Sequence, residues 1–237
     1  MSLYVYAITR TSHPLHLDRL HGVGDPPTEL RAVRADSLCA VVSGLPDDLK
    51  ARRRDLEAHH EVQERLWEEG ATLPLSFGFV AEDENAVQAI LEERGAEFSQ
   101  RMDELADQVE FNVKATADEE AMLREIISGS DELRSLNEAT REGGGSPDQR
   151  VAFGQMLAEE VQRRQDALAE EIASALRPLA GSERISPPSS QYALNASFLV
   201  ERGKADEFGE TGRELGDRLQ NRAELRVLGP LPPYSFV

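Results

Sequence analysis

The alternation of hydrophobic and polar positions in the first 70 residues predicts three strands followed by a helix. The predicted elements are strands at residues 3–9, 30–33 and 38–42 and a helix at residues 47–69. The first strand is apolar on both of its alternating sets, which is typical of a strand covered on two sides. The next two strands are close enough to form a hairpin, and Gly70 ends the helix. We therefore expect an N-terminal α+β domain of βββα order over residues 1–70.

A second α+β domain is expected over residues 71–229. Its predicted elements are a strand at 72–79, a helix over 83–105 with a bend at Gly95, strands at 108–115 and 191–200, a helix after Gly203 and a strand at 224–228. These segments form two β-α-β units, and two such units with right-handed crossovers build a modified ferredoxin-like βαββαβ sheet with helices on one face. The predicted outer face of this sheet carries Glu110, Asn112, Asn195 and Glu224.

A long helical insertion interrupts the predicted sheet over residues 118–189. Its longest helix follows the glycine run Gly143–Gly145, which we interpret as a hinge or an exposed loop. Ser146 and Gln149 form a capping box at the start of this helix, and Pro147 occupies its first position. Strands linked as a hairpin need only a short turn, so an insertion of this length indicates an added function.

The chain finishes on an apolar segment, Gly229–Val237, although the ends of chains are usually polar and frayed. Its prolines fix φ and remove backbone donors, so the segment can lie extended with little entropy left to lose. We therefore predict that residues 230–237 are a C-terminal tail that packs between the two domains and joins them. The residues expected to make this interdomain contact are Pro230, Pro232, Pro233, Tyr234 and Phe236.

Charge and cysteine content narrow the possible partners. A net charge of -18 repels phosphate backbones and anionic lipid head groups, so neither nucleic acid nor a membrane is an expected partner. The sequence has no run of eighteen apolar residues and no secretory signal pattern at its start, so we expect a soluble, cytoplasmic protein. Cys39 is the single cysteine; it cannot form an internal disulfide, and its apolar neighbours favour a buried thiol.

The sequence lacks the motifs that are typical of catalysis or cofactor binding. It has no glycine-rich phosphate loop, HExxH, CxxC or GxSxG. His13, His16 and His21 lie close together, but a loop is a better interpretation than a metal site because no carboxylate or thiol falls at a matching spacing. His59 and His60 point about 100° apart on a helix, which favours structural hydrogen bonds over a general-base pair. We therefore expect no enzyme activity, no cofactor and no metal.

Four patches of the chain resemble the gas vesicle protein GvpF/GvpL family. They are LYVYAI near the N-terminus, residues 56–80, the late strand NASFLV and the terminal GPLPPYSFV, and they span nearly the whole chain. The resemblance implies a two-domain α+β accessory protein of gas vesicle formation, either a minor structural component or an assembly factor, at the gas vesicle and in the cytoplasm. It also implies binding to the major gas vesicle shell protein and to other gas vesicle accessory proteins. The family often has Trp where this chain has Leu231.

The residues alone leave two other classes of function open. One is a small-molecule-sensing module built on the ferredoxin-like sheet, which saturable metabolite binding would identify. The other is a hydrolase that uses His59 or His60 with nearby carboxylates, which loss of turnover on replacing His60 would identify. The assembly function is favoured on physical grounds, because an acidic escort keeps a hydrophobic shell subunit soluble, and a groove or the helical insertion can receive a helix of that subunit.

Overall fold

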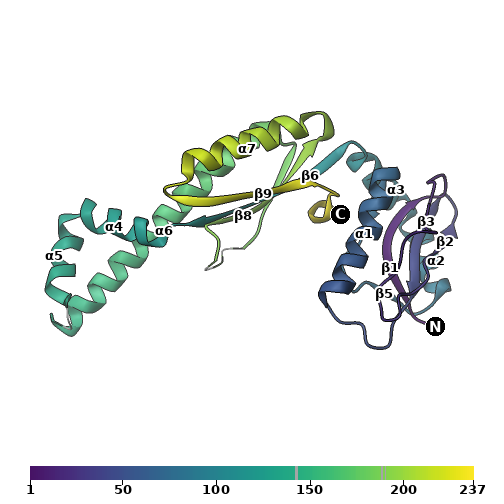
Figure 1. The fold of residues 1–237 in the computed structure, drawn as a ribbon, viewed down its shortest axis with the longest axis horizontal. Coiled ribbons are helices and arrows are strands. Elements are labelled where there is room, and N and C mark those ends of the chain that lie inside the picture. Colours follow the sequence, from purple (N-terminus) through teal and green to yellow (C-terminus); the bar gives the residue numbers. More distant parts are fainter. Residues whose placement is uncertain (142–143, 188, 190) are drawn as a thin grey trace. The chain divides into compact units, whose positions relative to one another are not determined.

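The computed structural model describes residues 1–141, 144–187, 189 and 191–237, which form an α+β protein of two compact units (Figure 1). Unit 1 comprises Met1–Glu110 and Pro230–Val237, and unit 2 comprises Phe111–Gly229. The chain passes between the units twice, within strands β6 (Gln108–Ala117) and β9 (Ala223–Leu231), which are neighbours in one sheet. The predicted α+β class is confirmed.

Unit 1 contains a sheet in the order β2-β3-β1-β4, and β5 also pairs with β1. Its strands are β1 (Leu3–Arg10), β2 (Arg31–Ala35), β3 (Leu38–Gly44), β4 (Thr72–Pro74) and β5 (Val80–Ala81), and its helices are α1 (Arg53–Glu69), α2 (Glu84–Glu93) and α3 (Gly95–Leu105). The paired strands run antiparallel. The three strands and the helix predicted for the first 70 residues are therefore present, although the helix begins later than predicted.

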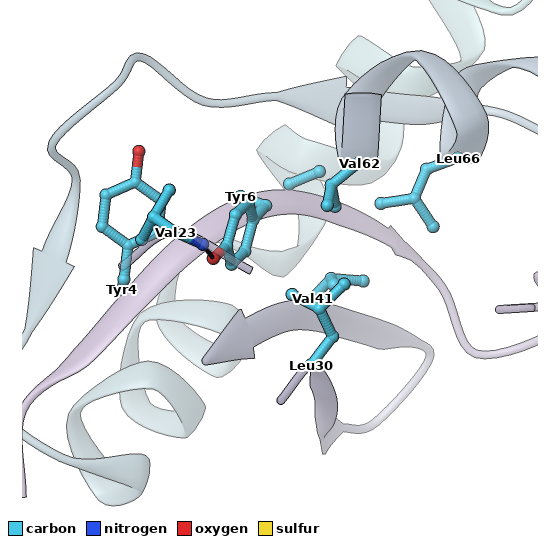
Figure 2. Packing of buried hydrophobic residues seen from close by; sticks show 8 residues of the cluster. Tyr4, Tyr6, Val23, Leu30, Val41, Val62 and Leu66 are labelled. Carbon is cyan, nitrogen blue, oxygen red and sulfur yellow. Dashed lines mark hydrogen bonds between the residues drawn. The ribbon is translucent and has the colours of Figure 1, made fainter. Parts of the chain in front are cut away.

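The core cluster of unit 1 joins β1, β3 and α1. β1 is buried along nearly its whole length, as its two apolar faces predict. Its tyrosines pack into a cluster that contains Tyr4, Tyr6, Val23, Leu30, Val41, Val62 and Leu66 (Figure 2). The Tyr6 hydroxyl accepts a hydrogen bond from the Val23 backbone N–H at 2.8 Å and lies 3.0 Å from the Ser43 hydroxyl. The buried phenol is therefore fully partnered, as a polar group in a core must be.

The boundary between the units differs from the expected boundary at residue 70. β4 and β5 both pair with β1, so the segment expected to begin the second domain forms the edge of the unit 1 sheet. Gly78 has a φ of 90° and turns the chain between β4 and β5, which breaks the single strand expected at 72–79. Helices α2 and α3 contact strands of the same sheet. The first β-α-β unit predicted from the sequence is therefore wrong.

Unit 2 nevertheless has the predicted ferredoxin-like βαββαβ order, built from partly different segments. Its elements are β6, α4 (Glu119–Gly129), α5 (Asp131–Thr140), α6 (Pro147–Leu176), η2 (Arg177–Leu179), β7 (Ser182–Ile185), β8 (Leu194–Glu201), η3 (Arg202–Lys204), α7 (Ala205–Leu219) and β9. In the sheet order β7-β8-β6-β9, α6 connects β6 to β7 with β8 between them, and α7 connects β8 to β9 with β6 between them. Two strands that a helix joins across one intervening strand form the split β-α-β arrangement. β7, expected to be a loop, pairs antiparallel with β8 and supplies the missing strand.

The helical insertion predicted over residues 118–189 is present only in part: α4, α5 and the first part of α6 are extra helices, whereas the rest of α6 is a crossover helix and β7 is a strand of the sheet. Figure 1 shows α4 and α5 beside the end of α6 that lies away from the sheet. We call α4, α5 and residues 147–163 the helical arm. The predicted capping box begins α6, because Ser146 Oγ accepts a hydrogen bond from the Gln149 N–H and Gln149 Oε1 accepts one from the Ser146 N–H. Of the expected glycine loop, Gly143 lies outside the described residues, and the two glycines after it are exposed.

Candidate interaction surfaces

The C-terminal segment, Pro230–Val237, belongs to unit 1. It begins with the last two residues of β9 and closes with a single 3-10 turn, η4 (Tyr234–Phe236). Pro232 and Pro233 are buried, Tyr234 is half-buried and Pro230 is exposed. Phe236 is only 2% exposed, so the end of the chain is anchored rather than frayed. The packing of this segment between two domains stays a prediction.

Tyr234 is held by His60 of α1. The Tyr234 hydroxyl lies 2.6 Å from His60 Nδ1, and the two ring centroids are 5.7 Å apart. Burial raises the pKa of Tyr234, and the carboxylates of Glu64 and Glu110 raise it further. The phenol therefore keeps its proton at neutral pH and remains available for this hydrogen bond. The sequence favours a structural hydrogen bond for His60, but it does not identify the partner.

Ser235 docks onto Glu110 through two hydrogen bonds. The Glu110 carboxylate accepts from the Ser235 backbone N–H at 2.7 Å and from the Ser235 hydroxyl at 2.6 Å. Glu110 is 3% exposed, so its prediction as a solvent-facing residue of the sheet is wrong. A buried carboxylate is costly unless hydrogen bonds satisfy it, and Ser235 supplies two of them. Nothing in the sequence marks this pair, because its partners are 125 residues apart.

Arg101 of α3 makes the third polar contact to the segment. It donates a hydrogen bond to the Phe236 carbonyl oxygen and forms an ion pair with Glu104 at 2.7 Å. A cavity of about 520 Å³ lies beside the chain end, and its lining includes Leu73, Phe98 and Val237. The C-terminal segment therefore forms part of the wall of an open groove on unit 1.

An apolar hollow adjoins this groove. It has a volume of about 70 Å³, and it shares Leu75, Arg94 and Phe98 with the larger cavity. Phe79, which also lines the hollow, is 43% exposed, and its neighbour Val80 is exposed to the same extent. Exposed apolar side chains that lie together are typical of a protein-binding surface. This surface was not predicted from the sequence, because it depends on residues 72–81 joining the unit 1 sheet.

The helical arm presents a second apolar surface. Val151 on α6 is 58% exposed, and the apolar residues that follow it at helical spacing are half-buried. These half-buried residues are Phe153, Met156, Leu157 and Val161. Ile126 of α4 and Leu133 of α5 are buried in the arm. This apolar stripe of α6 is therefore only partly covered by the two shorter helices.

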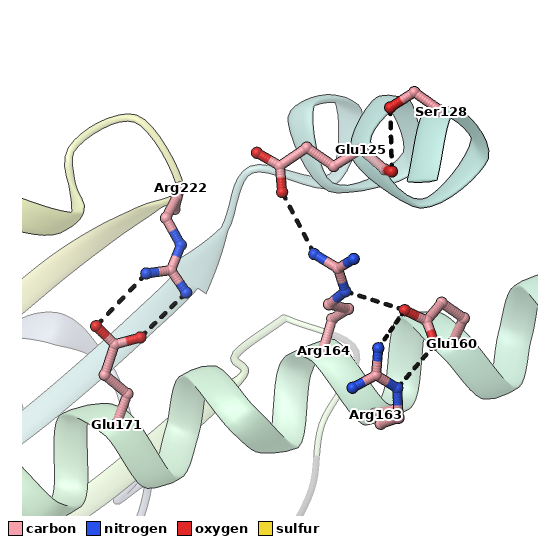
Figure 3. Close-up of polar contacts among 7 residues, drawn as sticks. All are labelled: Glu125, Ser128, Glu160, Arg163, Arg164, Glu171 and Arg222. Atoms are coloured by element: carbon pink, nitrogen blue, oxygen red, sulfur yellow. Dashed lines mark hydrogen bonds and ion pairs between the residues drawn. The ribbon is translucent and has the colours of Figure 1, made fainter. Parts of the chain in front are cut away.

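Ion pairs fasten the base of the arm (Figure 3). Arg164 of α6 lies 3.4 Å from a carboxylate oxygen of Glu125 on α4 and 3.0 Å from one of Glu160. Hydrogen bonds from Arg163 and Arg164 lower the pKa of Glu160 to about 2, so the carboxylate stays charged at neutral pH. Closer to the sheet, Arg222 and Glu171 form a further pair at 3.0 Å. Of these contacts, the pair between Arg164 and Glu125 joins α4 to α6, and the pair between Arg222 and Glu171 joins α6 to the residue before β9.

Two of the three clustered histidines, His13 and His16, have structural contacts. His13 Nε2 lies 2.8 Å from the Leu66 carbonyl oxygen, and His16 Nδ1 lies 3.2 Å from Glu69. His21 is exposed. Within the part of the chain that the structure describes, no group of three or more His, Cys, Asp or Glu side chains is placed to hold a metal ion.

His59 is buried between two fixed partners. Its Nε2 lies 3.0 Å from the Leu75 carbonyl oxygen, which can only accept, so Nε2 carries the proton and Nδ1 accepts from the Tyr4 hydroxyl at 2.8 Å. Burial lowers the pKa of His59 to about 4. Both ring nitrogens are thus committed to structural hydrogen bonds. Burial also raises the pKa of the Cys39 thiol, which is fully enclosed as the sequence predicts.

Comparisons with known proteins agree along the whole chain. The family described as "Gas vesicle synthesis protein GvpL/GvpF" matches residues 2–237. Gas vesicle protein F of Streptomyces sp. (strain CB03234) is 44% identical over 100% of both chains, and gas vesicle protein F of Dolichospermum flosaquae is 26% identical over 99% of this chain and 96% of its own. The crystal structure of GvpF from Anabaena sp. PCC7120 has the same fold, with a TM-score of 0.82 and 23% identity over 99% of this chain and 97% of that one. In the described residues, no helix has the length and apolar content needed to cross a membrane.

Proposed function

The chain belongs to the gas vesicle synthesis protein GvpL/GvpF family, and we propose that it binds the hydrophobic major shell protein, together with other gas vesicle accessory proteins, during gas vesicle formation. In this proposal the protein acts in the cytoplasm and at the gas vesicle as a binding protein rather than an enzyme. Its net charge of -18 would keep a complex with a hydrophobic subunit soluble.

The observation that carries the proposal is the partly exposed apolar stripe on the helical arm. Val151 is 58% exposed, and the stripe continues through half-buried side chains for about three turns of α6. A helix of the shell protein can lie along such a stripe and bury it, as amphipathic helices do in grooves between helices. Glu159 is exposed near the stripe and would favour a partner segment with basic residues.

Most of the arm can be removed in a variant that keeps the C-terminal half of α6. Deleting the whole insertion, residues 118–189, would also remove the C-terminal half of α6, where Ile172 and Leu176 are fully buried. The ion pair between Glu125 and Arg164 shows instead that α4 and α6 approach each other at the base of the arm. Residues 127–161 can therefore be replaced by a short Gly/Ser linker, which leaves the crossover helix in place.

The test is co-purification of the major shell protein with the intact protein, with this truncated variant and with Val151→Glu. We expect the truncation to abolish capture and Val151→Glu to reduce it, because a buried unpaired carboxylate opposes docking. Leu56→Glu is the matched control, since Leu56 is a 42% exposed apolar residue on a helix of unit 1. Undiminished capture by the truncated variant would exclude the arm. Failure of the intact protein to capture the shell protein would refute the proposed function.

A further inference from the structure

The outer edge of β9 is open. In the sheet order β7-β8-β6-β9, β9 is the end strand, and no described strand pairs with its other side. An end strand offers a row of unpaired backbone donors and acceptors to another strand. The first five residues of β9 (Ala223–Val227) contain no proline, so every backbone N–H in this stretch is present.

The hydrogen bonds of β6 identify which residues of β9 face the open edge. The Ala115 carbonyl oxygen accepts from the Ala193 N–H, next to β8, whereas the Asp118 N–H donates to the Arg222 carbonyl oxygen, next to β9. Because hydrogen-bonding direction alternates along an antiparallel strand, the even-numbered residues of β9 face β6. The N–H and C=O groups of Ala223, Leu225 and Val227 therefore point to the open edge.

The two faces of β9 differ in chemistry. Leu225 and Val227 face α7, where two glycines leave room for them: a Cβ on Gly212 would lie 2.9 Å from Val227 Cγ2, and one on Gly216 would lie 3.7 Å from Leu225 Cβ. An open groove of about 910 Å³ runs along this face. On the opposite face, Glu224 and Arg226 have side chains that are 62% and 74% exposed and form an ion pair at 2.8 Å.

We propose that β9 pairs antiparallel with β9 of a second copy of this chain, with the two-fold axis at Leu225. In this register the edge-facing groups of Leu225 meet those of Leu225 in the second copy, and Ala223 meets Val227. Glu224 then lies opposite Arg226 of the second copy, and the symmetry repeats this ion pair. The two four-stranded sheets would become one continuous sheet, and apolar side chains from both copies would meet in the groove beside α7.

Charge complementarity favours this register of the strand pair and favours a second copy of this chain as the partner. Shifting the symmetry axis by one residue places Arg226 against Arg226, or Glu224 against Glu224, in the two copies. Like charges directly opposite each other destabilise a strand pair. Natural sheets use such charged side chains on edge strands to prevent a strand from pairing in a shifted register. A five-residue strand pair is a small interface, so the dimer should be weak and dependent on concentration.

Sedimentation velocity over a series of protein concentrations tests the proposal with charge-swapped variants. The wild type should pass from monomer to dimer as concentration rises. Arg226→Glu and Glu224→Arg each convert two attractive pairs into two repulsive pairs, so each should raise Kd by about tenfold or more. The double swap should restore the dimer. An equimolar mixture of the two single variants should form a heterodimer, because every cross-strand pair is then complementary.

Arg184→Glu is the control, because it makes the same charge change on β7, the strand at the opposite end of the sheet, and it should leave Kd unchanged. Circular dichroism of each variant checks that the fold is retained, as expected for exposed positions. A wild type that is monomeric at every concentration would overturn the proposal. So would single variants that dimerise like the wild type, or a mixture that does not recover association.

Discussion

Replacing Phe236 by alanine tests how strongly the C-terminal segment is anchored. Phe236 is 2% exposed, and deleting a buried phenylalanine side chain costs about 3–5 kcal/mol in a protein core. Its neighbours Tyr234 and Ser235 are only half-buried and Val237 is exposed, so the segment can shift to fill part of the cavity. We therefore expect a loss near the lower limit, about 3 kcal/mol. For a unit of this size, that loss corresponds to a decrease in Tm of about 10 °C.

The assay is thermal unfolding by scanning calorimetry, with Val237→Ala as the control in the same segment. Val237 is 43% exposed, so shortening its side chain should cost less than about 1 kcal/mol. Deleting residues 230–237 should lower Tm at least as much as Phe236→Ala and, if the segment also joins two domains, should increase domain mobility in small-angle scattering. Equal Tm values for the wild type and Phe236→Ala would show that the burial of the segment does not stabilise the fold, and the reasoning would fail.

Three further predictions follow from buried or open positions elsewhere. The pKa of His59 is about 4 in the native state and about 6.5 in the unfolded state, so below pH 6.5 the unfolded state binds a proton that the native state does not bind. The free energy of unfolding should therefore fall as pH is lowered from 6.5 to 4, by up to about 3 kcal/mol. In His59→Gln this part of the pH dependence should be absent from denaturant unfolding curves, and a dependence equal to that of the wild type would contradict the assignment. Cys39 should resist maleimide labelling in the native protein and react only on unfolding, because its side chain is fully buried; labelling at the rate of a free thiol would count against the fold. Gly154→Ala should stabilise α6 by about 1 kcal/mol, because a Cβ at this position meets no atom within 4 Å, and slower hydrogen exchange in the arm would report it. Unchanged or faster exchange would indicate that α6 differs there from the structure.

The helices were the most predictable part of the fold. The long helix begins at its predicted capping box, and the helix predicted after Gly203 is present as α7, which buries Phe208, Gly212, Leu215 and Leu219. These signals are local, because capping and a 3.6-residue period depend on residues a few positions apart. The ferredoxin-like class was predicted, but its first β-α-β unit was assigned to the wrong segments, because residues 72–105 belong to unit 1.

Strand partners were much less predictable. The apolar alternation after Gly70 identified an extended segment, but the same pattern fits either sheet, and the pairing of β4 with β1 is a contact across more than 60 residues. β7 was missed because its four residues, SERI, are largely polar and exposed. An alternation pattern indicates that a strand is half-buried; it does not say against which sheet.

The features of the candidate surfaces were also predictable only where they depend on the local sequence. The anchoring role of Phe236 could be inferred from composition, because an apolar chain end requires burial. Its polar partners could not, since Glu110 and Arg101 carry no sequence mark and reach the segment only through the folded chain. The apolar residues of α6 recur at helical spacing in the sequence, whereas their partial exposure depends on how much of them the short helices α4 and α5 cover.

Site-specific photo-crosslinking in cells that form gas vesicles tests the central claim, binding of the shell protein along the arm, most directly. A photoreactive amino acid replaces Val151 in one variant and Leu56 in another, so that both probes lie on exposed helical positions. The account predicts a crosslinked product with the major shell protein from position 151 and none from position 56. Absence of that product from position 151, in cells where the variant still supports gas vesicle formation, would contradict it.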